Sequence, residues 1–290
     1  MTSHFDIKTQ VIPRVLTYTF KAELPMNFVN MMNKFIDENV IPHDPNFGEV
    51  AGNVTVKNSY TKGLVGQIRQ DKKSAQLDFD ILNSDTGKVV KELLDKCCTQ
   101  YLTTIGHGDT YPDVFGAWTV HSYAGDYNPL HEHGVETPSG LSMIMYLKVP
   151  KCIEDLPEPA DDGSTYLNHV SGLVDGFTYF NWNNLNITDI RNLYQAGEEY
   201  VKPKVGKLLI FPNWMKHAVM PFFGEGERRT FSANCNLYAP EMFGCKFLDL
   251  SKEELLQVYD YFSNEEQKKI KEVFKKKFRY GENSGKLEKK

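Results

Sequence analysis

Several features that would place this chain in a special class of protein are missing from its sequence. No apolar run approaches the roughly 18 to 20 residues that a membrane span needs, and the opening residues MTSHFDIKTQ lack the basic and then apolar order of a secretory signal. The five cysteines include no C-x-x-C pair of the kind that holds zinc or drives redox exchange. We therefore expect a cytoplasmic protein with reduced thiols and no membrane partner.

The sequence also lacks a strong charge of one sign. The formal net charge is -5 and the acidic and basic residues are scattered, so no broad basic field favours a nucleic-acid duplex as the primary partner. A small anionic ligand needs only a local basic site. With 290 residues, of which 41% are hydrophobic, the composition fits a globular protein with one main core and appended elements. Nothing in the sequence indicates an oligomeric state.

The chain divides into three regions of different texture. Residues 1–113 are predicted to form a support region with helices over residues 24–40 and 85–102, where apolar residues recur at helical spacing, and with edge strands between them. Residues 114–240 form the predicted functional core. Residues 241–290 are predicted to hold a helix, which begins at the capping box SKEE of residues 251–254, and a basic tail.

The middle region is rich in aromatic and branched residues that alternate with clusters of Gly, Pro, Asn and Asp, which is typical of an antiparallel barrel or sandwich. Two long polar insertions, residues 151–175 and 182–200, are expected to act as lids, binding loops or decoration. The predicted strands are residues 115–123, 141–149, 176–181, 207–211, 218–221 and 228–237.

The strongest local pattern is YNPLHEHG at residues 127–134, in which one residue separates two histidines. Side chains at positions i and i+2 of an extended chain point the same way, so His131 and His133 can bind one ion from one side. Imidazole suits iron, zinc, copper and nickel, so this pattern leaves the metal open. Taken alone, it also fits ordinary surface or core histidines.

A third candidate ligand lies far along the chain, in the segment KLLIFPNWMKHAV of residues 207–219. A buried apolar strand ends there at a proline turn, and His217 follows at the start of the next extended segment. A ligand from a distant strand would complete a metal site with three ligands on one face. If this segment stood alone, a histidine that caps the turn beneath Trp214 would be the preferred interpretation.

The segment ERRTFSANCN of residues 227–236 supplies a possible anion site. Strand alternation places Arg228, Thr230, Ser232 and Asn234 on one polar face. A guanidinium beside a hydroxyl can hold a carboxylate, because its planar fork binds both oxygens while the hydroxyl fixes their orientation. The structural alternative is that Arg228 pairs with a nearby acid, Glu225 or Glu227.

In this order, the segments GDYNPLHEH, SMIMYLKVP, GKLLIFPNWMKHAV and ERRTFSAN resemble the 2-oxoglutarate/Fe(II) oxygenase superfamily, in particular its prolyl-hydroxylase-like bacterial and phage branch. The resemblance covers roughly residues 114–238. Each motif is weak, but their joint order is specific.

The resemblance implies a mainly β fold with flanking helices, a double-stranded β-helix of the cupin-type jelly roll. It implies iron bound by His131, His133 and His217, with Arg228 and Thr230 receiving the distal carboxylate of 2-oxoglutarate. Tyr146 is similar to the tyrosine that often lines that pocket, although it also fits a core position. The implied activity is a dioxygenase reaction that couples oxidative decarboxylation of 2-oxoglutarate by O2 to hydroxylation of a substrate C–H bond.

One departure from the family pattern affects the metal site. Most members have aspartate or glutamate two positions after the first histidine, and here that residue is His133. Three neutral imidazoles would leave the full +2 charge of the iron uncompensated. A bulge could instead bring Glu132 or Glu136 to the metal, so the second ligand stays open at this point, with His133 preferred.

Two other functions are compatible with the same histidines. One is a non-catalytic metal-binding jelly-roll module, and the other is a zinc metallohydrolase. A carboxylate anchor at Arg228 and Thr230 favours the oxygenase, because a hydrolase has no inherent use for it. Asn128 and His121 are candidates for a supporting role around the metal. The substrate is open: a prolyl residue of a peptide or protein is suggested only by the resemblance.

Overall fold

The computed structural model shows two β-sheets with helices against one of them. Its described residues are 7–14, 17–43, 66–67, 75–158, 174–182 and 197–238. Nearly all of them belong to one compact unit, Met1–Gly108 with Pro112–Leu237. The second unit, Asp109–Tyr111 with Tyr238–Lys290, lies almost wholly outside the described residues. The predicted C-terminal helix, the basic tail and most of both insertions also lie outside them.

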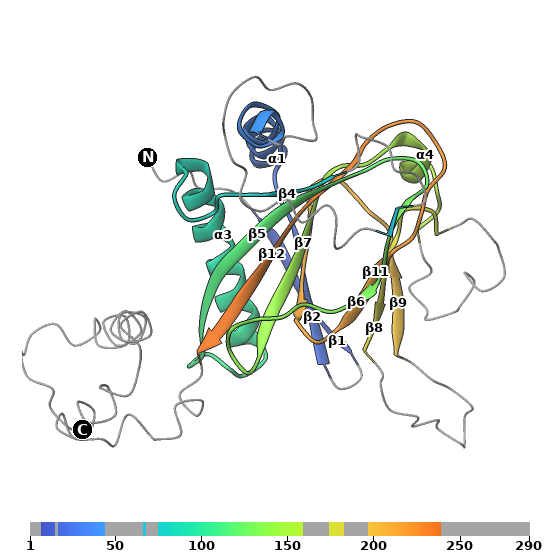
Figure 1. The fold of residues 1–290 in the computed structure, drawn as a ribbon. Helices are drawn as coiled ribbons and strands as arrows, with labels where there is room; N and C mark the ends of the chain where they lie inside the picture. Colours follow the sequence, from blue (N-terminus) through green and yellow to red (C-terminus); the bar gives the residue numbers. More distant parts are fainter. Residues whose placement is uncertain are drawn as a thin grey trace, which may run out of the picture. The chain divides into compact units, whose positions relative to one another are not determined.

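The larger sheet has seven strands in the order β1-β2-β10-β7-β12-β5-β4 (Figure 1). The strand pairs whose register is defined are antiparallel. Its strands are β1 (Lys8–Arg14), β2 (Thr17–Glu23), β4 (Ala75–Asp78), β5 (Tyr111–Ser122), β7 (Gly140–Lys148), β10 (Lys207–Pro212) and β12 (Arg228–Tyr238).

The smaller sheet has five strands in the order β3-β6-β11-β8-β9. Its pairs are antiparallel as well. Its strands are β3 (Gly66–Gln67), β6 (Asp126–His131), β8 (Thr178–Asn181), β9 (Glu198–Val201) and β11 (Lys216–Val219).

The path of the chain between the sheets defines a double-stranded β-helix. From β5 to β8 each successive strand lies in the other sheet, β8 and β9 pair within the smaller sheet, and β10, β11 and β12 alternate again. Antiparallel strands that alternate in this way between two sheets form a jelly roll, in which the space between the sheets can hold a site. The predicted mainly β jelly roll is therefore confirmed.

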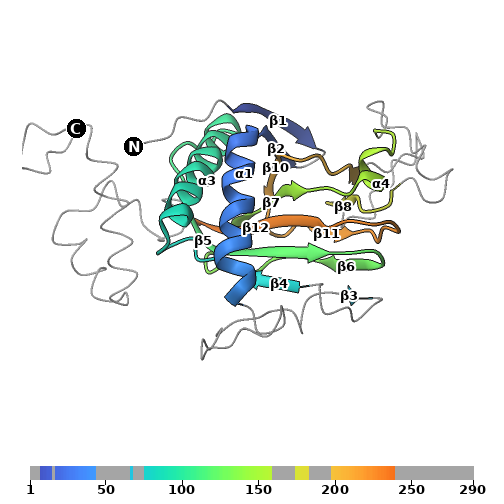
Figure 2. The same cartoon turned by 90° about the horizontal axis from the view of Figure 1, so that it is seen from above.

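Helices cover the outer face of the larger sheet (Figures 1 and 2). Helix α1 (Met26–Phe35) continues into the π-helical turn η1 (Ile36–Val40) and the short 3-10 turn η2 (Ile41–His43). Helix α3 (Asp85–Thr104) begins after Ser84, whose hydroxyl accepts a hydrogen bond from the Gly87 amide at 2.9 Å; such a cap satisfies one of the free amides of the first turn. The short α4 (Lys151–Glu154) follows β7. No helix in the described part of the chain is long and apolar enough to span a membrane.

Strand β7 shows how the two layers of core form. Its side chains alternate, so that Met143 and Met145 pack into the cluster that includes α1 and α3, while Ile144 and Tyr146 pack into the cluster between the sheets. A strand buried on both faces is mostly apolar, which explains the continuous run MIMYL of residues 143–147. The same alternation separates the two faces of β5 and β12.

The six strands predicted in the middle region correspond to β5, β7, β8, β10, β11 and β12. Strands β1, β2, β6 and β9 were not predicted. The reason is local for β6, since DYNPLH carries a proline and few branched residues, and for β9, since it is only four residues long within a polar stretch. The division of the chain into three regions stays a prediction.

Candidate metal centre

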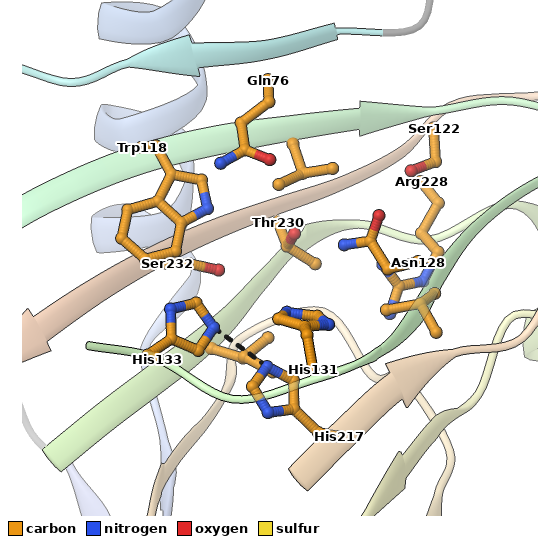
Figure 3. A pocket seen from close by; sticks show the side chains of 13 residues that line it. Gln76, Trp118, Ser122, Asn128, His131, His133, His217, Arg228, Thr230 and Ser232 are labelled. Atoms are coloured by element: carbon orange, nitrogen blue, oxygen red, sulfur yellow. Dashed lines mark hydrogen bonds between the residues drawn. The ribbon is translucent and has the colours of Figure 1, made fainter. Parts of the chain in front are cut away.

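Three histidines from separate parts of the sequence converge in the space between the two sheets. His131 ends β6, His133 follows it, and His217 lies on β11, which pairs with β6 so that His217 is opposite His131. One ligand nitrogen from each ring lies within 4.8 Å of the other two. The Nε2 atoms of His133 and His217 are 3.1 Å apart (Figure 3). The tertiary structure thus brings together all three predicted metal ligands.

Backbone carbonyl groups fix the orientation of two of the rings. Nδ1 of His131 is 2.6 Å from the carbonyl oxygen of Pro129, and Nδ1 of His217 is 3.2 Å from that of Met215. Because a carbonyl oxygen only accepts hydrogen bonds, each Nδ1 carries the proton and each Nε2 keeps a free lone pair. This is the arrangement in which metal-binding histidines are usually held.

A β-bulge in β6 directs side chains into the site. His131 pairs with His217 and Asn128 pairs with Val219, so β6 spans three positions where β11 spans two. The extra residue lies in the Pro129–Leu130 stretch, and Leu130 is exposed to solvent. Without the bulge, residues an odd number apart would face opposite sides of the strand; with it, Asn128 and His131 line the same pocket.

The environment keeps the imidazoles of His133 and His217 unprotonated. Burial, together with the neighbouring His131, lowers the pKa of His133 to about 4. Burial and the two other rings hold the pKa of His217 well below its ordinary value. Both side chains therefore offer lone pairs at neutral pH, which metal binding requires.

The position of His133 is set by the turn between β10 and β11. The His133 amide donates to the Asn213 carbonyl oxygen at 3.1 Å, and Nδ2 of Asn213 donates to the His133 carbonyl oxygen at 3.0 Å. The indole of Trp118 stacks on the His133 ring with 5.2 Å between centroids and 20° between planes. Neither supporting residue was predicted. The proline turn before Asn213 was the available signal, since it brings that side chain next to a candidate ligand.

The two carboxylates considered as alternative ligands lie elsewhere. Glu132 is exposed, as strand alternation predicts for the residue between two inward-facing histidines. Glu136 accepts a hydrogen bond from Nδ2 of Asn236 at 3.0 Å. Neither of them belongs to the group of ligand atoms that converges in the described part of the chain.

A buried guanidinium shares the pocket with the histidines. Arg228 is 1% exposed, and among the described residues it forms no ion pair with a carboxylate. Nε donates to the carbonyl oxygen of Gly176 at 3.0 Å, and one terminal nitrogen donates to Oγ1 of Thr178 at 3.2 Å. Gly176 has a φ of 70°, a left-handed conformation that suits glycine. A buried positive charge without a partner is costly, so the pocket is suited to an anion.

The hydroxyl groups near Arg228 come from three strands. Thr230 lines the pocket, as predicted. Tyr146 is fully buried behind the arginine, with its ring centroid 5.4 Å from the guanidinium carbon and its hydroxyl 2.7 Å from Oγ1 of Thr178. Thr178 was not predicted, because only the tertiary structure brings its strand β8 next to Arg228. The tyrosine thus contacts Arg228 and is not among the residues that line the cavity.

The pocket extends from Arg228 at one end to Trp118 at the other, with the three histidines beside it (Figure 3). Asn128 lines it, but His121 does not: it faces the back of the larger sheet, where Nδ1 lies 2.6 Å from Oε1 of Glu227. The structure therefore places His121 away from the pocket in which a supporting role was considered for it, because alternation along β5 turns it to the opposite side from Trp118. The remaining side chains of the lining are Gln76, Val120, Ser122, Ile144, Val219, Thr230 and Ser232.

The donor set fits a divalent transition metal. Two ligand atoms at right angles, each about 2.1 Å from an ion, are about 3.0 Å apart, close to the 3.1 Å between Nε2 of His133 and Nε2 of His217. Three imidazoles on one side of an ion leave its other side to further ligands. The pocket is thus compatible with a metal that binds an organic anion. It offers imidazole nitrogens to the metal and the buried Arg228 guanidinium to the anion.

Residues 116–234 match a family model described as "Putative 2OG-Fe(II) oxygenase". This segment belongs to the 2OG-Fe(II) oxygenase family. The match contains both sheets from β5 to β12, the three histidines and Arg228. Residues 116–234 are accordingly an oxygenase segment of a family that uses Fe(II), 2-oxoglutarate and O2.

A search of solved structures finds partial similarity to several proteins, three of which follow. A prolyl-4-hydroxylase from Pseudomonas putida is 11% identical with a TM-score of 0.40, covering 80% of this chain and 92% of its own. A viral collagen prolyl hydroxylase from Paramecium Bursaria Chlorella virus-1 is 17% identical with a TM-score of 0.34, covering 61% and 84%. HygX from Streptomyces hygroscopicus, solved with nickel and 2-oxoglutarate bound, is 11% identical with a TM-score of 0.40, covering 79% and 82%. A search of curated proteins returns no significant match.

Proposed function

We propose that this oxygenase couples oxidative decarboxylation of 2-oxoglutarate to hydroxylation of a substrate C–H bond, with Fe(II) bound by His131, His133 and His217. Arg228 and Thr230 would receive the distal carboxylate of 2-oxoglutarate. The observation that carries the proposal is the buried guanidinium of Arg228, which no carboxylate of the described residues pairs with, in the same pocket as the three converging imidazoles.

Each side chain has a defined task in this proposal. The imidazoles hold the metal through nitrogen lone pairs that the Pro129 and Met215 carbonyl groups keep directed inward. Arg228, already hydrogen-bonded through Nε and one terminal nitrogen, turns its remaining donors toward the pocket. When bound, the metal and its cosubstrates supply the oxidising chemistry, while the protein positions the reactants.

The substrate would enter at the end of the pocket away from Arg228. Trp118 and Gln76 line that end and offer an indole face and a carboxamide (Figure 3). A prolyl residue of a peptide or protein is the first substrate to test, and its support is the sequence resemblance to prolyl-hydroxylase-like members. A small molecule is the other class to test. The cytoplasm stays the predicted location.

The two rival functions are not favoured. The family of residues 116–234 is one of oxygenases. A zinc hydrolase or a simple metal-binding module would also have no use for an isolated buried cation beside the metal site.

Release of CO2 from labelled 2-oxoglutarate, measured with and without Fe(II), tests the proposal. We expect Fe(II)-dependent release in the wild type, even without the true substrate, and its loss in His217→Ala. In Arg228→Gln we expect the affinity for 2-oxoglutarate to fall about 10- to 100-fold, as for a charge-assisted hydrogen bond worth about 1.5–3 kcal/mol. Tight metal binding without any release of CO2 would favour the non-catalytic module.

A further inference from the structure

A buried network of charged and polar side chains lies on the back of the larger sheet, directly behind the pocket. Glu227 is at its centre, with a side chain 15% exposed. Its carboxylate accepts hydrogen bonds from Nδ1 of His121 at 2.6 Å, Nζ of Lys148 at 3.0 Å and Nε of Arg229 at 2.7 Å. Burial alone would raise the pKa of Glu227, but these donors hold it well below its ordinary range, so the carboxylate is ionised.

Arg229 connects this network to the helices. Its terminal nitrogens donate to Oδ1 of Asp37 at 2.7 Å and to Oδ1 of Asn33 at 3.1 Å. Asn33 lies on α1, and Asp37 lies in the π-helical turn η1 that follows it. Turns of this kind are often found at functional sites. The helix that covers the sheet is thus tied to the first residues of β12.

The contact between α1 and the start of β12 lies at a bulge in β7. Arg229 pairs with Lys148 but Thr230 pairs with Tyr146, so Leu147 is an extra residue in β7. Nδ2 of Asn33 donates to the Leu147 carbonyl oxygen at 3.0 Å, which satisfies a group that the bulge removes from the ladder. Asn33 therefore contacts both the bulge and Arg229.

Arg228 lies between the two residues that the network holds most firmly. Because successive side chains of a strand face opposite sides, fixing Glu227 and Arg229 on the back face obliges Arg228 to face the pocket. Arg228 itself has no carboxylate partner among the described residues to fix its direction. Its hydrogen bonds to Gly176 and Thr178 hold the guanidinium itself, while the side of the sheet from which Arg228 projects depends on its neighbours Glu227 and Arg229.

We infer that Glu227, held by His121, Lys148 and Arg229, is a positioning residue that aims the Arg228 guanidinium at the distal carboxylate of 2-oxoglutarate. The inference rests on the proposed function, because it assumes that Arg228 binds this carboxylate. It assigns a role to a network that touches neither metal nor cosubstrate. Loss of the Glu227 charge should loosen the first residues of strand β12 and misdirect the Arg228 side chain.

Comparison of two ligands separates this role from simple stabilisation. Pyruvate has the same keto-acid end as 2-oxoglutarate but no distal carboxylate. The dissociation constant for pyruvate divided by that for 2-oxoglutarate therefore reports the Arg228 contact alone. Both constants would be measured by calorimetry with Fe(II)-loaded protein in the absence of O2. In Glu227→Gln we expect this ratio to fall about tenfold, the size usual for residues that orient a ligand-binding group, while the affinity for pyruvate is retained.

The matched control is Asp113→Asn. Asp113 forms an ion pair of similar exposure with Lys91, at 2.8 Å between α3 and β5, and lies away from Arg228. We expect this variant to lose stability but to keep the wild-type ratio. An unchanged ratio in Glu227→Gln, or an equal loss of affinity for both ligands, would overturn the inference.

Two further outcomes are decisive. If Glu227→Gln does not fold, Asp37→Asn replaces it, because the Asp37 side chain is half-exposed and contacts the same network, at 2.7 Å from Arg229 and 3.8 Å from Lys148. About a threefold fall in the ratio is expected there, and no fall would overturn the inference. A wild-type ratio near one would contradict the proposed anchor itself and so the proposed function, which distinguishes the two failures.

Discussion

Arg228 and Arg229 are adjacent, equally buried and of the same chemistry, yet their surroundings differ. Arg229, 2% exposed, pairs with two carboxylates on the back of the larger sheet. Arg228, 1% exposed, contacts a backbone carbonyl, a threonine hydroxyl and the Tyr146 ring, and pairs with no carboxylate in the described part of the chain. Because a buried charge needs compensation, this difference makes Arg229 part of the folded structure and supports the proposal that Arg228 binds a ligand.

Replacing each arginine by methionine is the strongest test of this difference between Arg228 and Arg229. Arg229→Met should lower the free energy of unfolding by about 3–5 kcal/mol, because the largely buried Glu227 carboxylate loses one of its partners and Asp37 loses its shortest ion pair. Arg228→Met should cost much less in the absence of ligand, since no carboxylate loses its partner. Denaturant unfolding of the metal-free variants measures both values, and equal losses would contradict the distinction.

The pH dependence of stability tests the same difference at Glu227, the partner of Arg229. Its folded pKa is depressed, so its contribution is present above the unfolded pKa of about 4.3 and is lost as the pH falls through the folded value. At pH 7 we expect wild type to exceed Glu227→Gln by about 1–3 kcal/mol in unfolding free energy, with this difference narrowing below about pH 4.3. A gap that widens toward low pH would show that the carboxylate is not ionised in the folded protein.

The smallest expected effect concerns the support of the metal site. Asn213→Ala removes the side chain that holds the His133 carbonyl oxygen at 3.0 Å, so the His133 ring should be less well oriented. Affinity for Fe(II) should fall about tenfold, as measured by competition with a chelator. Asn39→Ala is the control, since the Asn39 side chain bonds only to the Phe35 carbonyl oxygen on an exposed helical turn. Equal affinities for Fe(II) in the two variants would show that Asn213 does not support the metal site.

Sequence patterns located the parts of the site that depend on local alternation. Arg228, Thr230 and Ser232 line the pocket because every second residue of a strand faces the same way. The H-x-H motif placed two imidazoles on one side for the same reason. Trp118, Gln76, Thr178 and Asn213 could not be predicted, since each reaches the site from another strand or turn and nothing in its own segment marks it.

The sequence by itself determined the mainly β fold, the candidate histidines and the polar face that carries Arg228, because these follow from spacing along one chain segment. Only the tertiary structure decided which of two neighbouring arginines has a carboxylate partner. Strand alternation could show that they face opposite ways, but not that Glu227 and Asp37 lie on one side and none of the described acidic residues pairs on the other. That difference arises from the packing of η1 and β5 around β12, which brings together residues far apart in the sequence.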